Sequence, residues 1–209
     1  MKDSLKTILY AAILGAVCAT LLAGVDQLTG PYKQANARAE RMRNILDVLQ
    51  VPFSRQSNPQ ELADIFIANV REKRFGELPV YVAAEPGDKD RIRAVAVGFE
   101  GRGLWGPIRG FLSLEPNMRT IRDITFYEQE ETPGLGGEIA SDWFREQFEG
   151  KQITNPAGRA GIRIVKAGRA RRENEVDAIT GATMTCEKVE AILNETIEKI
   201  TGAYLDDVE

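Results

Sequence analysis

The sequence predicts an α+β fold, in which an antiparallel β-sheet with flanking helices follows one N-terminal transmembrane helix. Three observations support this prediction. An uncharged apolar run lies near the N-terminus, short β-rich runs follow one another through the middle of the chain, and helical periodicity flanks them on both sides. Runs of strands with helices at both ends are typical of α+β proteins rather than of alternating α/β folds.

The apolar run from Thr7 to Val25 contains no charged residue and lies between Lys6 and Asp26. As a helix it would be roughly 28 Å long, which is close to the hydrocarbon thickness of a bilayer. We interpret it as an uncleaved membrane anchor. A cleaved signal peptide is the alternative, because a basic end, an apolar stretch and small residues near Ala23 also fit that pattern.

Basic residues flank the apolar run on both sides. Lys2 and Lys6 precede it, and Lys33, Arg38, Arg41 and Arg43 follow it. The positive-inside rule counts both flanks, so charge alone does not assign a side of the membrane. Only the habit of short basic N-termini to stay in the cytoplasm favours a soluble part on the outer side.

Two helices are predicted between the anchor and the strands. Residues 34–51 carry apolar side chains at helical spacing, with charges between them. Asn58 and Pro59 are a cap and a first-turn proline for a helix that continues to Arg71. These helices make a stalk or a lid, and we divide the chain into an anchor (1–30), a helical stalk that starts the soluble part (31–75) and a β-rich domain (76–209).

The β-rich domain is predicted from short runs separated by Gly, Pro and Asp turns. The expected strands are 78–82, 91–99, 108–114 and 121–127, followed by a short helix at 142–148, a strand at 162–165 and a last helix with an apolar stripe over 189–200. Such spacing favours an antiparallel sheet.

The composition excludes several classes of function. The chain has no histidine, which excludes Ser-His-Asp and Cys-His catalysis and removes the commonest metal ligand. We therefore expect no metal site and no catalytic residues. Only Cys18 and Cys186 are present, far apart in the chain, which argues against a structural disulfide or an iron-sulfur site. A net charge of -4 argues against nucleic acid as a partner.

Glycines cluster at residues 98–106 and 132–137. Neither cluster matches a nucleotide-binding motif. One interpretation is hairpin turns that need positive φ, and the other is a backbone that approaches a flat or anionic ligand closely. Trp105 lies between glycines, where it can be a core residue or stack on a planar ligand.

Two features lie close together near the C-terminus. A basic run contains Lys166, Arg169, Arg171 and Arg172, which form either a solvated loop or a partner for phosphate. The stretch DAITGATMT follows at residues 177–185. Thr183 or Thr185 can cap the last helix, and the same helix start would also stabilise an anion.

Three motifs carry a family resemblance. D-A-I-T-G-A-T at 177–183 resembles the flavinylation motif D-x-x-[ST]-G-A-[ST]. G-R-G-L-W-G at 101–106 with G-F-L-S-L-E-P at 110–116, and E-T-P-G-L-G-G at 131–137, are similar to the FMN-binding C subunit of the sodium-translocating NADH:quinone reductase. The related G subunit of the Rnf complex shares the E-T-P-G-L-G and flavinylation motifs. The resemblance covers nearly the whole chain.

The resemblance implies a site for FMN in the domain at 76–209. Thr183 would carry FMN through a phosphoester, donated from FAD by a separate flavin transferase. Trp105 and Leu135 would pack near the flavin ring, Glu131 and Thr132 would supply polar contacts, Lys166 would lie near the ring or its tail, Thr180, Gly181 and Ala182 would shape the turn, and Asp177 would anchor that turn for the transferase.

The resemblance also implies the function. The chain would be a single-pass membrane subunit of a redox-driven ion-translocating complex of the Nqr or Rnf type, with its soluble domain on the periplasmic side. It would carry electrons between other membrane subunits and catalyse nothing on its own. A stand-alone extracytoplasmic flavoprotein reductase and a cofactor-free anchoring protein are the alternatives.

Overall fold

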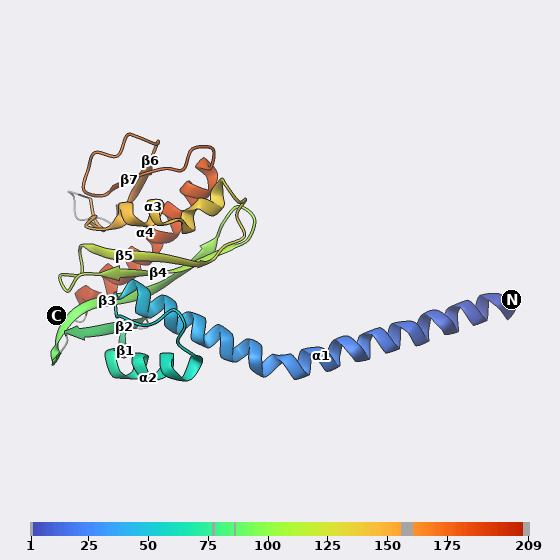
Figure 1. The fold of residues 1–209 in the computed structure, drawn as a ribbon. Helices are drawn as coiled ribbons and strands as arrows, with labels where there is room; N and C mark the ends of the chain where they lie inside the picture. The colour runs from blue at the N-terminus through green and yellow to red at the C-terminus, as the bar shows by residue number, and fades with distance from the viewer. Residues whose placement is uncertain (1, 77, 86, 156–160, 207–209) are drawn as a thin grey trace. The chain divides into compact units, whose positions relative to one another are not determined.

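The computed structural model describes residues 2–76, 78–85, 87–155 and 161–206. Its contacts divide the chain into two units, Met1–Arg41 and Met42–Glu209, which are described separately. Helix α1 (Lys2–Val48) makes up the described part of the first unit and continues into the second (Figure 1). The boundaries expected at residues 30 and 75 remain predictions.

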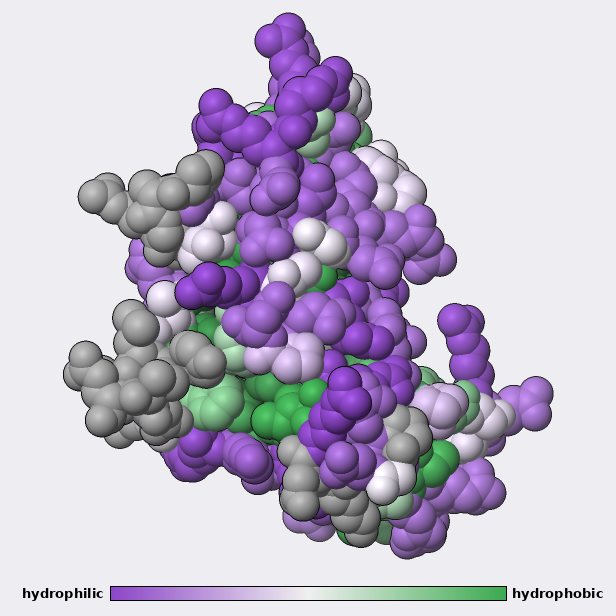
Figure 2. Space-filling view, turned by 90° about the vertical axis from the view of Figure 1, so that its left-hand side faces the viewer, coloured by the Kyte–Doolittle hydropathy of each residue, from purple (hydrophilic) through white to green (hydrophobic). Residues whose placement is uncertain are grey.

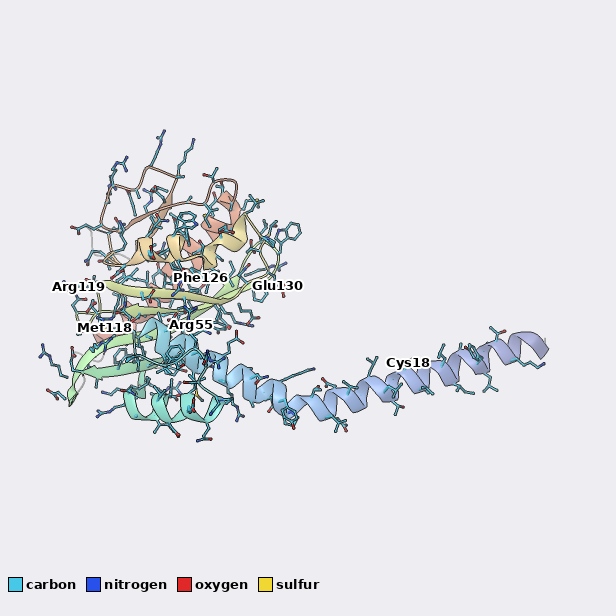
Figure 3. All side chains as sticks on the ribbon, in the orientation of Figure 1. Cys18, Arg55, Met118, Arg119, Phe126 and Glu130 are labelled. Carbon is cyan, nitrogen blue, oxygen red and sulfur yellow. The ribbon has the colours of Figure 1, made fainter. Side chains whose placement is uncertain are left out.

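The first unit is a helix with apolar side chains on its surface. Large apolar residues between Ile8 and Tyr32 are 50% to 75% exposed. The helix from Lys6 to Val48 is long and apolar enough to cross a membrane, with a mean hydropathy of 2.3 in its most apolar window. Cys18 projects from this helix (Figure 3) and is exposed. Exposed apolar side chains of this kind are stable in lipid, not in water.

The second unit is built on one antiparallel sheet. Its five strands are β1 (Val70–Phe75), β2 (Leu78–Glu85), β3 (Asp88–Arg102), β4 (Pro107–Leu114) and β5 (Ile121–Glu128), in the order β1-β2-β3-β4-β5. Every neighbouring pair is antiparallel. The α+β class, the antiparallel sheet and its four predicted strands are therefore confirmed.

Strand β1 is absent from the sequence-based expectation, which continues a helix to Arg71. Helix α2 (Pro59–Asn69) begins as predicted, with the Asn58 side chain accepting from the Gln60 and Glu61 amides. It ends where β1 starts. β1 reads VREKRF and lies at the edge of the sheet with four exposed residues in a row. Charged side chains suit an edge strand because they discourage pairing with other chains, but they hide the strand's period in the sequence.

Each face of the sheet carries a core. Alternate residues of a strand point to opposite faces. On one face, Val95, Val97, Leu112 and Leu114 pack with Val189, Leu193 and Ile197 of helix α4 (Thr183–Asp206). On the other face the ring of Tyr81 lies 6.2 Å from Phe66 of α2 and 5.9 Å from Phe111. Helices therefore cover both faces.

The segment after β5 completes the first core. It contains the short helices η1 (Gly136–Ala140), α3 (Asp142–Arg145) and η2 (Glu146–Phe148), where one helix over 142–148 is predicted. Phe126 of β5 (Figure 3) lies 5.4 Å from Phe99 and 6.3 Å from Phe144 of α3, ring centroid to ring centroid. This packing holds α3, which follows the loop 129–135, against the sheet.

Strands β6 (Arg163–Val165) and β7 (Glu175–Asp177) form a separate parallel pair that leads into α4. β6 is predicted from the sequence and β7 is not, since β7 reads EVD and has one β-branched residue between two acidic ones, whereas β6 reads RIV and has two β-branched residues. The face shown in Figure 2 is mainly hydrophilic, and its most extensive hydrophobic area lies in the lower half.

Candidate functional site

The TGAT turn, residues 180–183, connects β7 to α4. Gly181 has φ +82°, a conformation that glycine adopts without strain. The Cys186 amide donates to the Ala182 carbonyl, so the helix starts at this turn. Thr183 is the first residue of α4 and is exposed. Its side chain makes no hydrogen bond within the described residues, so the capping interpretation of Thr183 is not supported there.

Thr185 differs from Thr183 in the exposure and the hydrogen bonding of its side chain. It is 2% exposed, and its hydroxyl donates to Glu131 Oε2 at 2.6 Å. It therefore does not cap α4, which corrects that expectation. Thr180, the first residue of the turn, is exposed like Thr183 but lines the Lys166 recess and not the Trp105 recess.

Thr183 lines two recesses, and we call the first of them the Trp105 recess. It has a volume of about 230 Å³. Its lining consists of Leu104, Trp105, Glu131, Thr132, Leu135, Gly136, Gly181, Ala182, Thr183, Met184 and Thr185. Trp105 is 70% exposed, Leu135 43% and Met184 56%, so three large apolar side chains stand at its rim instead of in the core. The core interpretation of Trp105 is wrong, and a planar apolar ligand is what such a rim can cover.

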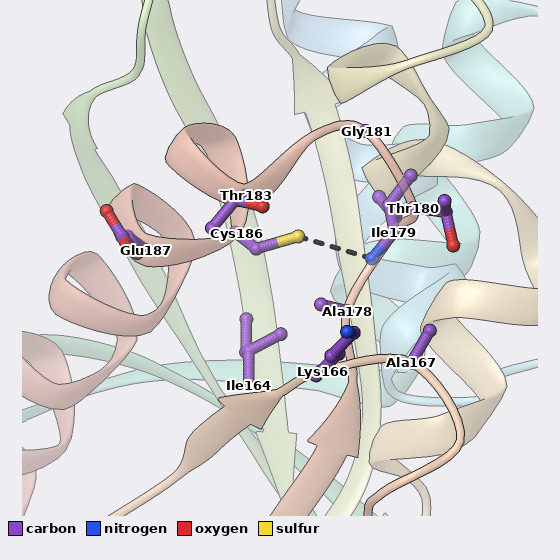
Figure 4. Close-up of a pocket in the computed structure, with 10 residues that line it drawn as sticks. All are labelled: Ile164, Lys166, Ala167, Ala178, Ile179, Thr180, Gly181, Thr183, Cys186 and Glu187. Atoms are coloured by element: carbon purple, nitrogen blue, oxygen red, sulfur yellow. Dashed lines mark hydrogen bonds between the residues drawn. The ribbon is translucent and has the colours of Figure 1, made fainter.

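Thr183 also lines a second recess, which we call the Lys166 recess (Figure 4). It has a volume of about 330 Å³ and is lined by Ile164, Lys166, Ala167, Ala178, Ile179, Thr180, Gly181, Thr183, Cys186 and Glu187. Thr183 and Cys186 come from α4, whereas Ile164 and Lys166 come from β6 and the loop after it (Figure 4). Gly181 and Thr183 line both recesses, so the two recesses adjoin at the TGAT turn.

Cys186 is a buried lining residue of the Lys166 recess. Its sulfur accepts from the Ile179 amide at 3.4 Å, which ties the first turn of α4 to the segment before the TGAT turn. Burial raises the pKa of its thiol. A thiol that stays protonated and buried acts as a small apolar residue.

Glu131 is a buried carboxylate under the Trp105 recess, at 4% exposure. Its Oε1 accepts from the Leu104 amide at 2.8 Å and the Trp105 amide at 3.1 Å. With the bond from Thr185 to Oε2, both of its oxygens have partners from the chain. The expectation that Glu131 contacts a flavin directly is therefore less well supported than a role inside the protein.

The first glycine cluster contains the turn between β3 and β4, but close packing, and not positive φ, requires its glycines. None of Gly101, Gly103 and Gly106 has positive φ. A Cβ on Gly103 would lie 2.5 Å from Glu131 Oε1, and one on Gly106 would overlap the side chain of Glu130, which lies beyond the end of β5 (Figure 3). In the second cluster Gly134 has φ +73°, as a turn requires.

Asp177 and Glu175 hold the basic loop that precedes them. Asp177 Oδ1 accepts from the Arg169 and Ala170 amides, each at 2.8 Å, and these backbone bonds lower the pKa of its carboxyl. Glu175 Oε2 accepts from the Arg171 and Arg172 amides, which lower the pKa of that carboxyl. Asp177 thus anchors the neighbouring loop through its side chain, where the sequence predicts an anchor for the TGAT turn itself.

The structure brings most of the predicted site residues together. Lys166, Thr180, Gly181 and Thr183 line the Lys166 recess, and Trp105, Glu131, Thr132, Leu135, Gly181, Ala182 and Thr183 line the Trp105 recess. Of the basic run only Lys166 lines a recess beside Thr183; Arg169, Arg171 and Arg172 are exposed. Leu104, Met184 and Thr185 are site residues that sequence reasoning did not assign, although Leu104 lies within the 101–106 motif and the other two directly follow the 177–183 motif.

Comparisons with known proteins agree with this site. A family model described as an FMN-binding domain matches residues 103–198, which span both recesses. The chain is similar to the C subunit of the Na(+)-translocating NADH-quinone reductase of Haemophilus ducreyi, at 30% identity over 90% of this chain and 88% of that protein. The protein of the same name from Pasteurella multocida is 29% identical, with the same coverage of the two chains.

Two solved structures have the same fold. The crystal structure of Shewanella oneidensis NqrC is similar with a TM-score of 0.68 and 25% identity, over 78% of this chain and 93% of that one. The C subunit of the Na(+)-translocating NADH-quinone reductase from Parabacteroides distasonis gives a TM-score of 0.67 at 25% identity, over 79% and 92%.

Proposed function

Because this chain belongs to the family formed by the C subunit of Na(+)-translocating NADH-quinone reductases, we propose that it carries FMN as a phosphoester on Thr183 and relays electrons within such a complex. One observation carries the attachment: the exposed Thr183 lines both recesses, whereas the exposed Thr180 lines only the Lys166 recess of the two, and Thr185 is buried and bonded to Glu131.

The residues around Thr183 fit a tethered flavin. The exposed side chains of Trp105, Leu135 and Met184 offer apolar contacts for an isoalloxazine ring. Lys166 lies on the other side of the tether, where its ammonium suits a phosphate or ribityl tail. The start of α4 adds free amides and the positive end of a helix dipole, which favour a phosphate on Thr183 by roughly 0.3–1 kcal/mol. When bound, FMN supplies reversible electron transfer.

Attachment needs an enzyme that the chain does not contain. We propose that the Thr183 oxygen attacks the FMN phosphorus of FAD on a separate flavin transferase. The new Thr–O–P bond replaces the bond between the two phosphates, AMP leaves, and the hydroxyl proton passes to a base. No histidine is available as that base in this chain. The chain is thus a substrate of the transferase before it becomes an electron carrier.

The long apolar helix and the names of the relatives support a place in a membrane complex. Helix α1 can hold the soluble unit at a membrane surface, and a covalent cofactor suits a carrier that exchanges electrons with neighbouring subunits. The names of the relatives favour an Nqr-type complex over an Rnf-type one. Recovery of the tagged chain from membranes without other subunits would favour the stand-alone reductase instead.

We propose that the soluble unit faces the periplasm, chiefly because the resembling subunits do. A reporter that is active only outside the cytoplasm, fused after Glu209, should be active. Activity of a cytoplasmic reporter at that position would show the opposite orientation. Basic residues flank the span on both sides, so the charge distribution alone does not predict the result.

Intact mass tests the attachment. The full chain, produced with a flavin transferase and magnesium, should gain the mass of FMN less one water. Thr183→Val should gain nothing, and Thr185→Val should gain the same mass as the wild type. A covalent flavin on Thr183→Val would refute the proposed site.

A further inference from the structure

The Glu131 carboxylate joins three parts of the fold that are distant in sequence. Its partners are the loop between β3 and β4 at Leu104 and Trp105, and the first turn of α4 at Thr185. Glu131 itself follows β5. One side chain thus links the aromatic wall of the Trp105 recess to the helix that starts with Thr183.

Two glycines leave room for this link. A Cβ on Gly103 would lie 2.5 Å from Glu131 Oε1. A Cβ on Gly136 would lie 2.5 Å from the Thr185 oxygen and 3.0 Å from Glu131 Oε2. The 2.5 Å distances are below those that real Cβ contacts show, so the carboxylate reaches its donors only because side chains are absent at 103 and 136.

We propose that Glu131 is a positioning residue, which couples the loop at Leu104 and Trp105 to the first turn of α4 through Thr185. Its oxygens accept three hydrogen bonds from the chain and are buried, so it acts on a ligand in the recess through Trp105 and Thr183. The consequence for the flavin rests on the proposed function. The coupling itself is a property of the polypeptide.

The buried charge has a second consequence for a flavin in the recess. A carboxylate near the ring repels the negative charge that the ring gains on reduction. This repulsion is stronger for a buried carboxylate, because burial weakens solvent screening. Glu131→Gln removes this charge and keeps an oxygen that can accept from the two amides. The midpoint potential of the attached flavin should therefore rise in Glu131→Gln.

Hydrogen exchange of the full chain, prepared without a transferase, tests the coupling directly. In Thr185→Val, the Leu104 and Trp105 amides should exchange about tenfold faster than in the wild type, as expected for a hydrogen bond to a charged group. This should happen although Thr185 contacts neither amide. Thr196→Val is the matched control, because Thr196 is also buried on α4 but donates only to the Ile192 carbonyl. It should leave both amides unchanged.

Two more variants keep the proposal testable if Thr185→Val folds poorly. Glu131→Ala should expose the Leu104 and Trp105 amides to fast exchange, and Glu131→Gln should restore slow exchange. Unchanged exchange in a folded Thr185→Val would overturn the coupling, as would unchanged exchange in Glu131→Ala. An unchanged potential in Glu131→Gln would overturn the effect on the flavin. Because exchange is measured without flavin, failure of attachment at Thr183 would refute the proposed function and leave the coupling decided by its own result.

Discussion

The first turn of α4 has two sides that carry the same residue type for different purposes. On the outer side Thr183 is exposed between the Trp105 recess and the Lys166 recess. On the inner side Thr185 is 2% exposed and donates to a buried carboxylate. The two hydroxyls are two positions apart in the chain, yet only the outer one is open to a modifying enzyme. Burial, not residue type, separates a modification site from a structural hydrogen bond.

The largest expected effects come from exchanging each hydroxyl for a methyl group. Thr183→Val should abolish flavin attachment and change the free energy of unfolding by less than about 0.5 kcal/mol, because the residue is on the surface. Thr185→Val should keep the flavin but lower the free energy of unfolding by about 1.5–3 kcal/mol, because a charged acceptor loses its donor inside the protein. Thermal unfolding and flavin absorbance measured on both variants check this. Equal losses of stability would contradict the comparison.

A smaller effect is expected at the rim of the outer side. Trp105→Ala and Leu135→Ala should leave the flavin attached to Thr183 but alter its absorbance, fluorescence or midpoint potential, because packing around the ring tunes its electronics. Trp143→Phe is a matched aromatic control, since Trp143 is 48% exposed but lines neither recess. An unchanged flavin in both rim variants would move the ring out of the Trp105 recess.

The next effect concerns the loop beside the outer side and depends on pH. Backbone hydrogen bonds lower the pKa of Asp177 in the folded protein, so its contribution to stability is present above its unfolded pKa and is lost as pH falls below about 4. Asp177→Ala should therefore be less stable than the wild type at pH 7, and the two proteins should become equally stable at low pH. We expect faster amide exchange at Arg169 and Ala170 and slower flavin attachment. Equal exchange at pH 7 in the variant and the wild type would show that the carboxylate does not hold this loop.

The smallest effect is expected from removing the span. The soluble part from Lys33 onward contains both cores described for the second unit, so it should fold cooperatively and stay monomeric. Calorimetry of this shortened chain should give a single transition close to that of the wild type in detergent. Aggregation that is relieved only by restoring the first 30 residues would argue against an independent domain.

Sequence reasoning predicted the parts of this protein that have a local signal. The long apolar N-terminal helix, the strands β2 to β5 and the Asn58 cap follow from apolar runs, alternation and capping residues. Strand β1 was not predicted because its edge position favours charged residues. Strand β7 was not predicted because it has one β-branched residue between two acidic ones.

The site shows the same limit. Motif similarity selected Thr183 and the recess residues, and contact between distant segments decided the rest. Glu131 and Thr185 are 54 positions apart, and no local pattern shows that they share a hydrogen bond. Asp177 was expected to act on the turn that follows it, but its carboxylate faces the loop that precedes it. Such contacts depend on how the strands and α4 pack.

The central claim is that Thr183 carries the flavin, and fragmentation of one peptide tests it most directly. Trypsin should release residues 173–188, which contain Thr180, Thr183 and Thr185 together. From the full chain produced with a flavin transferase, fragment ions should place the added mass of FMN less one water on Thr183, with Thr180 and Thr185 unmodified. The same mass on Thr180 or Thr185, or an unmodified peptide from protein with a confirmed active transferase, would contradict the account.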